Sequence, residues 1–289
     1  MLIQRHAVGV CVARRALAVA LGVSLVGAAA GQTRVYSSDA DFDLGVLVNL
    51  NHNPPFNNQL QLNPFAEPFP FICVACSDRG TIVRIETNTG QVLGEYRSAP
   101  DGRGRNPSRT TVDLYGDVWC GNRAENTNGD GSVVKVGLVI GGLRGNKLPD
   151  GGFVADANGE YLQPPFNYST AVDRDGDGLI RTSRGLGNIL GWSNSGGADD
   201  GGGVSTALDE AILVYARTPS AAEVRHVSID RENNLWVGGF PNYNPSWFLK
   251  LNGDTGAVMS SLNVAARFGC GGYGGLVDGN GVLWSASLN

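Results

Sequence analysis

The sequence predicts an all-β protein, a β-propeller of four-stranded antiparallel blades, and three observations support this. First, an apolar run ending in Asp, a polar turn and a second apolar run recur along the chain, most clearly at Arg225–Gly239 (RHVSIDRENNLWVGG). Second, the turn aspartates Asp113, Asp173, Asp230 and Asp278 are 60, 57 and 48 residues apart. Repeats of this length with several short strands are typical of propeller blades. Third, no segment after residue 30 has sustained helical periodicity, so almost no helix is expected.

The other copies of the pattern are TVDLYGDVW (Thr111–Trp119), the looser AVDRDGDGLI (Ala171–Ile180) and LVDGNGVLW (Leu276–Trp284). In the clearest copy we predict strands at His226–Ile229 and Leu235–Val237, joined by an Asp-headed turn. Aspartate favours such turns because its carboxylate accepts hydrogen bonds from nearby backbone N–H groups. We therefore expect the turn aspartates to cap their turns and the tryptophans to pack within the blades.

A run of three strands is also repeated. FICVAC (Phe71–Cys76) is followed by GTIVRIET and QVLGEYRS, and the last two are joined by the tight turn Asn88-Thr89-Gly90. The same order returns as NLWVGG, WFLKLN and AVMSSLN, with Asp254-Thr255-Gly256 at the corresponding turn. Two such turns at the same place in two repeats indicate a common blade construction.

The segments Ser132–Ile140 and Glu210–Arg217 are expected as third strands of their blades. The Gly-, Asp- and Asn-rich stretches Arg144–Pro165 and Leu186–Asp209 are expected as loops rising from the rim, where propellers build binding surfaces. About four and a half blades can be counted, near the low end for this fold. Because a propeller must close to protect its sheet edges, N-terminal strands should complete the last blade or, as we favour, the natural chain continues past Asn289.

The N-terminus predicts export. Basic residues are followed by the apolar run Ala16–Val26 and by Ala28-Ala29-Ala30, a cleavage pattern of small residues. We expect residues 1–30 to be a signal peptide cut after Ala30, because the apolar run is too short for a comfortable membrane span. Residues 31–70 are expected as an irregular segment joining the propeller at 71–289. The protein is thus predicted to be secreted or periplasmic, without a membrane span after cleavage.

Composition narrows the function. The chain has 289 residues, of which 42% are hydrophobic, and a net charge of −5, so a single large β domain is expected. Losing three arginines with the signal peptide would leave 19 basic and 27 acidic residues, or −8, which argues against nucleic-acid partners. Cys73 and Cys76 lie three apart in a predicted strand and point to opposite faces, so we expect thiols rather than a disulfide between them.

The segment from Asp173 to Gly178, DRDGDG, resembles the first half of a calcium loop. Alternating carboxylates followed by Gly surround a hard cation with oxygen. The expected ligands are Asp173, Asp175, Asp177 and the carbonyl of Leu179, completed by acids of the next loop, Asp199, Asp200, Asp209 or Glu210, because Arg184 stands where a closing Glu is usual. Alternatively, these acids merely solvate a hairpin turn.

Equivalent turns would place equivalent residues at the mouth of the propeller. Four residues before each turn aspartate are Arg109, Ser169, His226 and Gly274, and one step earlier are Ser108, Tyr168, Arg225 and Tyr273. We predict that Arg109, Tyr168, Arg225 and Tyr273 bind an anionic or sugar-like ligand through charged hydrogen bonds and ring contacts. His226 could serve there as a general base, or these side chains could instead pair with carboxylates and carbonyls between blades.

The segments HVSIDRENNLWVGG and GLVDGNGVLWSAS resemble NHL-type and streptogramin-lyase-like (virginiamycin B lyase-like) propellers of exported bacterial proteins. The resemblance covers about Phe71 to the end and implies a propeller fold. Lyases of that family use His and Glu with magnesium to open a cyclic ester by elimination. Only His226 corresponds in kind, and no second histidine stands at the predicted mouth.

Together these features predict an exported β-propeller that acts as a binding or interaction module stabilised by Ca²⁺. Its ligand, a small molecule, a glycan or a protein, would meet the axial mouth and rim loops. The alternative is a metal-assisted lyase or hydrolase with His226 as base.

Overall fold

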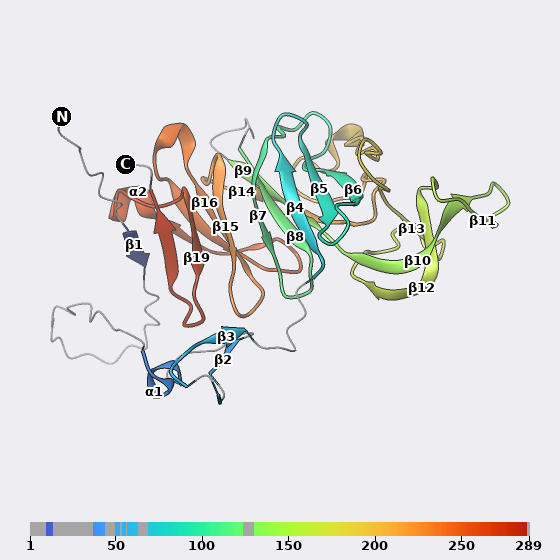
Figure 1. The fold of residues 1–289 in the computed structure, drawn as a ribbon. Coiled ribbons are helices and arrows are strands. Elements are labelled where there is room, and N and C mark those ends of the chain that lie inside the picture. The colour runs from blue at the N-terminus through green and yellow to red at the C-terminus, as the bar shows by residue number, and fades with distance from the viewer. Residues whose placement is uncertain are drawn as a thin grey trace, which may run out of the picture.

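The computed structural model describes residues 10–13, 37–43, 50–52, 54–55, 57–62, 69–123 and 130–287. This part of the chain is almost entirely antiparallel β-structure, with sheets standing side by side (Figure 1). Its α-helices are α1 (Asp39–Phe42) and α2 (Val264–Arg267), each four residues long. The predicted scarcity of helix is therefore confirmed for the described residues.

The strands follow the predicted runs closely. Their bounds are β1 (Val10–Ala13), β2 (Leu50–Asn51), β3 (Gln61–Leu62), β4 (Phe71–Cys76), β5 (Thr81–Glu86), β6 (Val92–Arg97), β7 (Pro107–Val112), β8 (Val118–Asn122), β9 (Gly131–Val136), β10 (Val139–Lys147), β11 (Phe153–Ala155), β12 (Tyr161–Ser169), β13 (Ile180–Arg181), β14 (Ile212–Thr218), β15 (Val224–Ile229), β16 (Leu235–Gly239), β17 (Trp247–Leu251), β18 (Val258–Asn263), β19 (Gly274–Val277) and β20 (Leu283–Ala286). Two 3₁₀ turns, Ser195–Gly197 and Pro241–Tyr243, interrupt the loops.

Four sheets form the propeller-like body. Their strand orders are β4-β5-β6, β7-β8-β9-β14, β15-β16-β17-β18 and β19-β20-β1. The strand β15 contacts β7 on one side and β19 on the other, so the first strands of three successive sheets lie side by side. Such sheets, each antiparallel and turned face to face around their first strands, are β-propeller blades. The predicted fold class is confirmed.

The first sheet aligns with the others through its cross-strand pairs. Cys73 of β4 stands opposite Arg84 of β5, as Trp119 stands opposite Lys135 and Trp236 opposite Lys250. The strand β4 is therefore the counterpart of the second strand of the other blades. This register also gives the two Asx-Thr-Gly turns the same position, between third and fourth strands, as predicted.

One predicted repeat is wrong. Ala171–Ile180 does not form a blade hairpin, because it lies in a large insertion between β9 and β14 that carries its own sheet, ordered β11-β10-β12-β13. Figure 1 shows this sheet projecting from the blades. An Asp-headed turn stabilises any tight connection, and this copy lacks the tryptophan of the others, so the pattern alone could not identify a blade.

Two further expectations are corrected by the insertion. Arg144–Pro165, predicted as a loop, contributes to β10, β11 and β12. Glu210–Arg217, predicted as a third strand, contains most of β14, which pairs with β9 as the fourth strand of the β7 sheet. The gap between β9 and β14 hides this pairing in the sequence, although Ile212 stands directly opposite Val136.

The turn aspartates cap their turns as predicted. Oδ1 of Asp230 accepts hydrogen bonds from the N–H groups of Glu232 and Asn234. Asp113 and Asp278 each accept the two equivalent bonds. In two blades a third-strand lysine adds a buried ion pair: Lys135 Nζ lies 2.9 Å from Asp113, and Lys250 pairs with Asp230.

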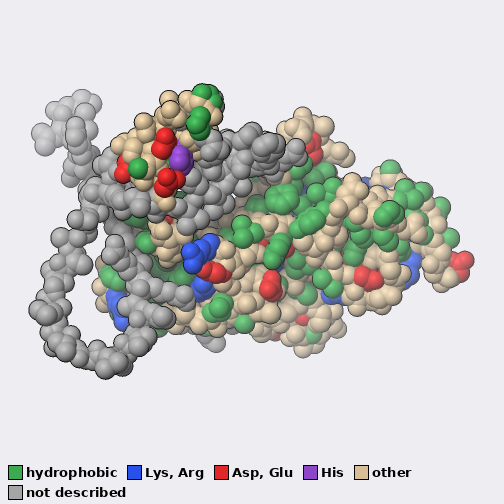
Figure 2. All heavy atoms as spheres, turned by 90° about the horizontal axis from the view of Figure 1, so that it is seen from below, with side chains coloured by type: hydrophobic (Ala, Val, Ile, Leu, Met, Phe, Trp, Pro, Cys, Tyr) green, Lys and Arg blue, Asp and Glu red, His purple; other side chains and the backbone are tan. Residues whose placement is uncertain are grey.

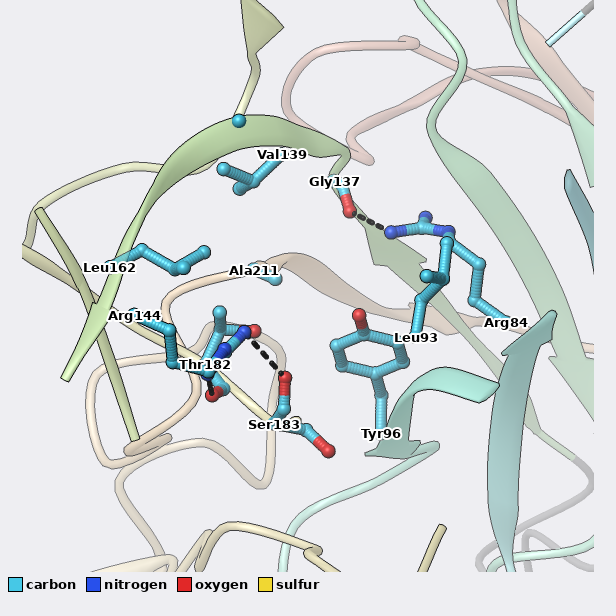
Figure 3. Close-up of a pocket in the computed structure, with 11 residues that line it drawn as sticks. Arg84, Leu93, Tyr96, Gly137, Val139, Arg144, Leu162, Thr182, Ser183 and Ala211 are labelled. Atoms are coloured by element: carbon cyan, nitrogen blue, oxygen red, sulfur yellow. Dashed lines mark hydrogen bonds between the residues drawn. The ribbon is translucent and has the colours of Figure 1, made fainter. Parts of the chain in front are cut away.

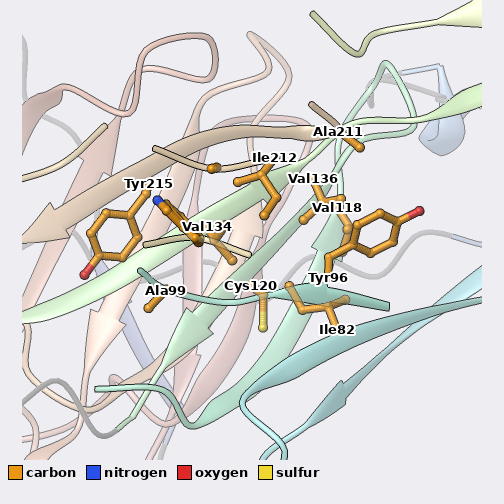
Figure 4. Close-up of a cluster of buried hydrophobic side chains, with 12 residues drawn as sticks. Ile82, Tyr96, Ala99, Val118, Cys120, Val134, Val136, Ala211, Ile212 and Tyr215 are labelled. Carbon is orange, nitrogen blue, oxygen red and sulfur yellow. The ribbon is translucent and has the colours of Figure 1, made fainter. Parts of the chain in front are cut away.

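Apolar side chains fill the space between blades. Figure 4 shows one cluster, in which Ile82 and Tyr96 of the first sheet meet Val118, Cys120 and Val134 of the second. Burial raises the pKa of the Cys120 thiol to about 12, so it acts as an apolar residue. Each fully buried side chain of this size contributes about 1.5–3 kcal/mol. Cys73, Cys76, Cys120 and Cys270 are free thiols.

The segment Leu186–Asp209 is more than a rim loop. Its Trp192 is fully buried in the same cluster and meets Tyr215 edge-to-face, with ring centroids 5.5 Å apart. The indole Nε1 donates to Asp199 over 2.7 Å. The second half of the insertion therefore returns to the blades and packs on them.

The two ends of the described chain meet in one sheet. The strand β1 pairs antiparallel with β20, with Val10 opposite Ala286 and Ala13 opposite Leu283. The residues of β1, Val10–Ala13, belong to the predicted signal peptide, and its cleavage stays a prediction. Among the described residues, no helix has the length and apolar character needed to span a bilayer. Further along, His52 lies between Asp39 and Asp43, and Figure 2 shows a histidine flanked by acidic side chains.

Candidate functional site

Three of the four residues predicted for the mouth lie together. Arg109 comes from β7 and Arg225 from β15, and their guanidinium carbons lie 5.1 and 5.8 Å from the ring centroid of Tyr273, which precedes β19. The backbone N–H of Tyr273 is held by the carbonyl of Ala286, and its ring meets Phe240 edge-to-face. Strands of three blades thus converge on one aromatic ring.

The charge of this cluster is not neutralised within the described residues. Neither Arg109 nor Arg225 has a carboxylate oxygen within 4.0 Å in that part of the chain, although the structure contains many such pairs elsewhere. Arg109 is exposed and Arg225 half-buried, with its Nε enclosed and unbonded in the described structure. Two guanidinium groups beside one ring suit a ligand with an anionic group and a flat or apolar face.

Tyr168 lies elsewhere because its repeat is not a blade. It belongs to β12 of the insertion, and its hydroxyl donates to the carbonyl of Tyr115 over 2.7 Å. Tyr115 sits in the turn after β7, at the opposite end of that strand from Pro107. Leu114, Tyr115 and Val172 are all more than half exposed. Seen from below, the molecule has hydrophobic side chains at its surface (Figure 2).

His226 is fully buried inside its sheet. Its Nε2 lies 2.8 Å from Ser228 Oγ, and its ring meets Phe248 edge-to-face at 5.0 Å. Burial lowers the pKa of His226 to about 4, against a smaller opposite effect of the Gly274 backbone. The imidazole is therefore neutral at physiological pH, and a solvent-borne substrate does not reach it in this conformation.

Part of the predicted calcium loop converges on one point. Asp173, Asp175 and Glu210 offer carboxylate oxygens that all lie within 4.8 Å of one another. Asp173 also accepts N–H bonds from Gly176 and Gly178, which lower its pKa although burial acts in the opposite direction. Glu210 closes the group from the far end of the insertion.

The other predicted ligands lie outside this group. Asp177 pairs with Lys147 at 2.7 Å and accepts the N–H of Leu179. Asp199 accepts bonds from Trp192, Ser205 and Thr206; burial would raise its pKa, but these bonds lower it to about 2. Asp200 accepts a bond from Asn194. Asp199 and Asp200 therefore organise their own loop.

A cavity that the sequence did not reveal lies between the blades and the insertion. It has a volume of about 140 Å³ and is lined by Arg84 of β5, Leu93 and Tyr96 of β6, and residues of the insertion such as Arg144, Leu162 and Thr182 (Figure 3). The only sign of this cavity in the sequence is Arg84, which occupies the position of Lys135 and Lys250 in the other blades but has no turn aspartate to pair with. The walls of the cavity come from segments that are far apart in the sequence, so residue spacing could not predict it.

The chain has only distant similarity to known proteins. No family model matches the chain, and no curated protein matches it. The solved structures that resemble it include the PQQ-bound form of aldose sugar dehydrogenase from Streptomyces coelicolor, with 14% identity, TM-score 0.23 and coverage of 76% of this chain and 72% of that one. Another is a catalytically inactive virginiamycin B lyase from Staphylococcus aureus with quinupristin, with 13% identity, TM-score 0.15 and coverage of 64% and 63%. At these TM-scores neither similarity supports a function, and the propeller assignment rests on the strand pairing described above.

Proposed function

We propose that this protein is an exported β-propeller binding module that takes an anionic, sugar-like ligand at Arg109, Arg225 and Tyr273. The observation that carries the proposal is the convergence of two arginines without carboxylate partners, within the described residues, on one tyrosine ring. Guanidinium groups recognise carboxylate or phosphate oxygens by paired hydrogen bonds. The aromatic ring can cover the apolar face of a sugar.

Binding is favoured over catalysis by the position of His226. A general base must come within hydrogen-bond reach of the proton it removes, and the His226 ring, which projects from β15, is fully buried and packs against Phe248. The export signal and a Ca²⁺ ion at Asp173, Asp175 and Glu210 remain parts of the proposal. Export is supported by the N-terminal sequence pattern, and calcium by the three converging carboxylates.

The mouth site can be tested by calorimetry with glucuronate and glucose 6-phosphate as probes and glucose as the neutral comparison. We expect the acidic sugars to bind at least about tenfold more tightly than glucose, because a hydrogen bond to a charged group is worth about 1.5–3 kcal/mol. Arg225→Gln should remove that preference. Arg231→Gln is the matched control, since Arg231 is exposed and pairs with Glu232. Equal binding of glucose, or an unchanged preference in Arg225→Gln, would refute the proposal.

A further inference from the structure

The cavity of Figure 3 has cationic side chains on opposite walls. On the blade side, Arg84 is 2% exposed and donates to the carbonyls of Gly137 and Val136 over 2.7 and 3.2 Å. On the insertion side, Arg144 donates to the carbonyls of Gly159, Thr182 and Ser183. Figure 3 shows the open space between these two groups. Backbone carbonyls hold both guanidinium groups in place without neutralising them.

The remaining polar groups around the cavity are donors rather than anions. Burial raises the pKa of Tyr96, so its hydroxyl remains protonated, and no hydrogen bond to it is made by the described residues. Burial also raises the pKa of the Cys73 thiol beside Arg84, against the opposite effect of the arginine, so the thiol carries no charge. The Nε of Arg84 is buried and unbonded in the described structure.

One buried carboxylate stands near this group. Asp209 accepts N–H bonds from Ser183 and Ala211. Burial raises its pKa to about 6, while these bonds and Arg174 act in the opposite direction. Asp117 also acts on Arg84, but it is already paired with Lys135 Nζ at 3.0 Å. Even when Asp209 is ionised, it and this paired carboxylate therefore do not neutralise the two guanidinium groups of the cavity. The described walls therefore carry an excess of positive charge, and buried charges in proteins are normally paired.

The orientation of the Tyr96 hydroxyl depends on a glycine in the same strand. A Cβ at position 94 would lie 2.4 Å from that hydroxyl, so the tyrosine can take this orientation only because residue 94 is glycine. Figure 3 shows the hydroxyl directed toward the centre of the cavity. At roughly 30 Å³ per water molecule, the space of about 140 Å³ suits an ion or a small acid rather than a sugar.

We propose that this cavity binds a small oxyanion, a tetrahedral ion such as phosphate or sulfate or a short carboxylate, between Arg84, Arg144 and the Tyr96 hydroxyl. The oxyanion would supply the missing negative charge and accept bonds from both walls at once. Because one wall belongs to the β5–β6 hairpin and the other to the insertion, the bound ion would fix the insertion on the blades. This site is separate from the mouth, so either proposal can fail alone.

The test uses the full chain with sulfate, inorganic phosphate and succinate as probes, and sodium chloride at equal ionic strength as the comparison. We expect sulfate or phosphate to raise the melting temperature in proportion to the logarithm of concentration, with a dissociation constant of about 1 mM or tighter. Succinate distinguishes the sources: a larger shift with succinate would identify a carboxylate ligand. Arg144→Gln should weaken binding about tenfold or more.

Tyr96→Phe keeps the buried ring and removes only the hydroxyl, so it reports on binding even if Arg144→Gln folds poorly. We expect it to weaken binding severalfold. Arg231→Gln serves as the matched control and should leave binding unchanged, because Arg231 is exposed, pairs with Glu232 and belongs to neither proposed site. The proposal is overturned if none of the three probes exceeds sodium chloride, or if Tyr96→Phe and Arg231→Gln respond alike.

Discussion

At the residue scale, the mouth could be predicted because register propagates from one well-marked position. Counting back four residues from Asp113 gives Arg109, and counting back five from Asp230 and Asp278 gives Arg225 and Tyr273. In regular strands these two offsets point to opposite faces, but the pairing shifts register between Pro107 and Arg109 and between Val224 and His226. Tyr168 was counted from Asp173, whose turn is not part of a blade. The sequence could not predict which of these side chains would be buried. His226 is four residues before its turn aspartate, as Arg109 is, yet Phe248 covers it.

The burial of His226 predicts a pH-dependent stability. Its folded pKa of about 4 lies below the ordinary value of 6.5, so between these values the unfolded chain binds a proton that the native protein does not. The contribution of His226 to stability is therefore full above about pH 6.5 and is lost as the pH drops toward 4, by up to about 3 kcal/mol.

This can be measured as the free energy of urea unfolding at about pH 7.5 and pH 4.5. His226→Gln should flatten the difference by about 2–3 kcal/mol, because glutamine does not titrate while it can still bond Ser228. Asp199, with a pKa lowered to about 2, adds its own acid loss mainly below pH 4. Asp209, whose folded pKa is raised to about 6, acts within this window and opposes His226, because its contribution to stability is lost as the pH rises toward 6. Asp209 is present in both proteins, so its effect cancels in their comparison. Identical pH slopes in the two proteins would show that His226 is not the titrating group.

At the element scale, the sequence predicted the strands of the blades but not the sheet of the insertion between β9 and β14. Asp-capped turns and tryptophans repeat in the three sheets that begin at β7, β15 and β19, so one copy explains the next. The sheet β11-β10-β12-β13 occurs once, and its strand Tyr161–Ser169 contains consecutive prolines that obscure a strand. The predicted calcium loop lies within this insertion, and Glu210 comes close to it only because the chain returns there to form β14 beside β9. The order of the residues alone therefore left several acids as candidates to close the loop.

Removal of metal tests the calcium proposal. If Asp173, Asp175 and Glu210 hold Ca²⁺, EDTA should lower the melting temperature and added calcium should restore it, since an ion that binds only the folded state stabilises it. Asp175→Asn should abolish the response, because it removes one of the three converging carboxylates. Asp175 is exposed, so the change disturbs little else.

Asp150→Asn gives a matched control on the same insertion, where Asp150 only caps the N–H of Gly152. It should respond to EDTA and calcium like the unaltered protein. A melting temperature that EDTA leaves unchanged would remove calcium from the proposal.

At the scale of the whole molecule, the sequence predicted an exported chain, and the structure pairs Val10–Ala13 of the predicted export signal with the last sheet. Cleavage after Ala30 would separate β1 from β20. We expect protein recovered from outside the cytoplasm to begin at Gly31, as measured by intact mass and N-terminal sequencing. Recovery of that protein with Met1 and β1 retained would contradict the predicted cleavage.

The pairing of β1 with β20 has a further consequence for the processed protein. If the predicted leader is removed, the edge of Leu283–Ala286 loses β1 as its partner, and its amide and carbonyl groups become available to another strand, including one from a later part of the natural chain. A passing extended peptide, or the same margin of a sister molecule, could then take the vacated place. Removal of the predicted signal peptide would thus expose a sheet edge that can pair with another strand.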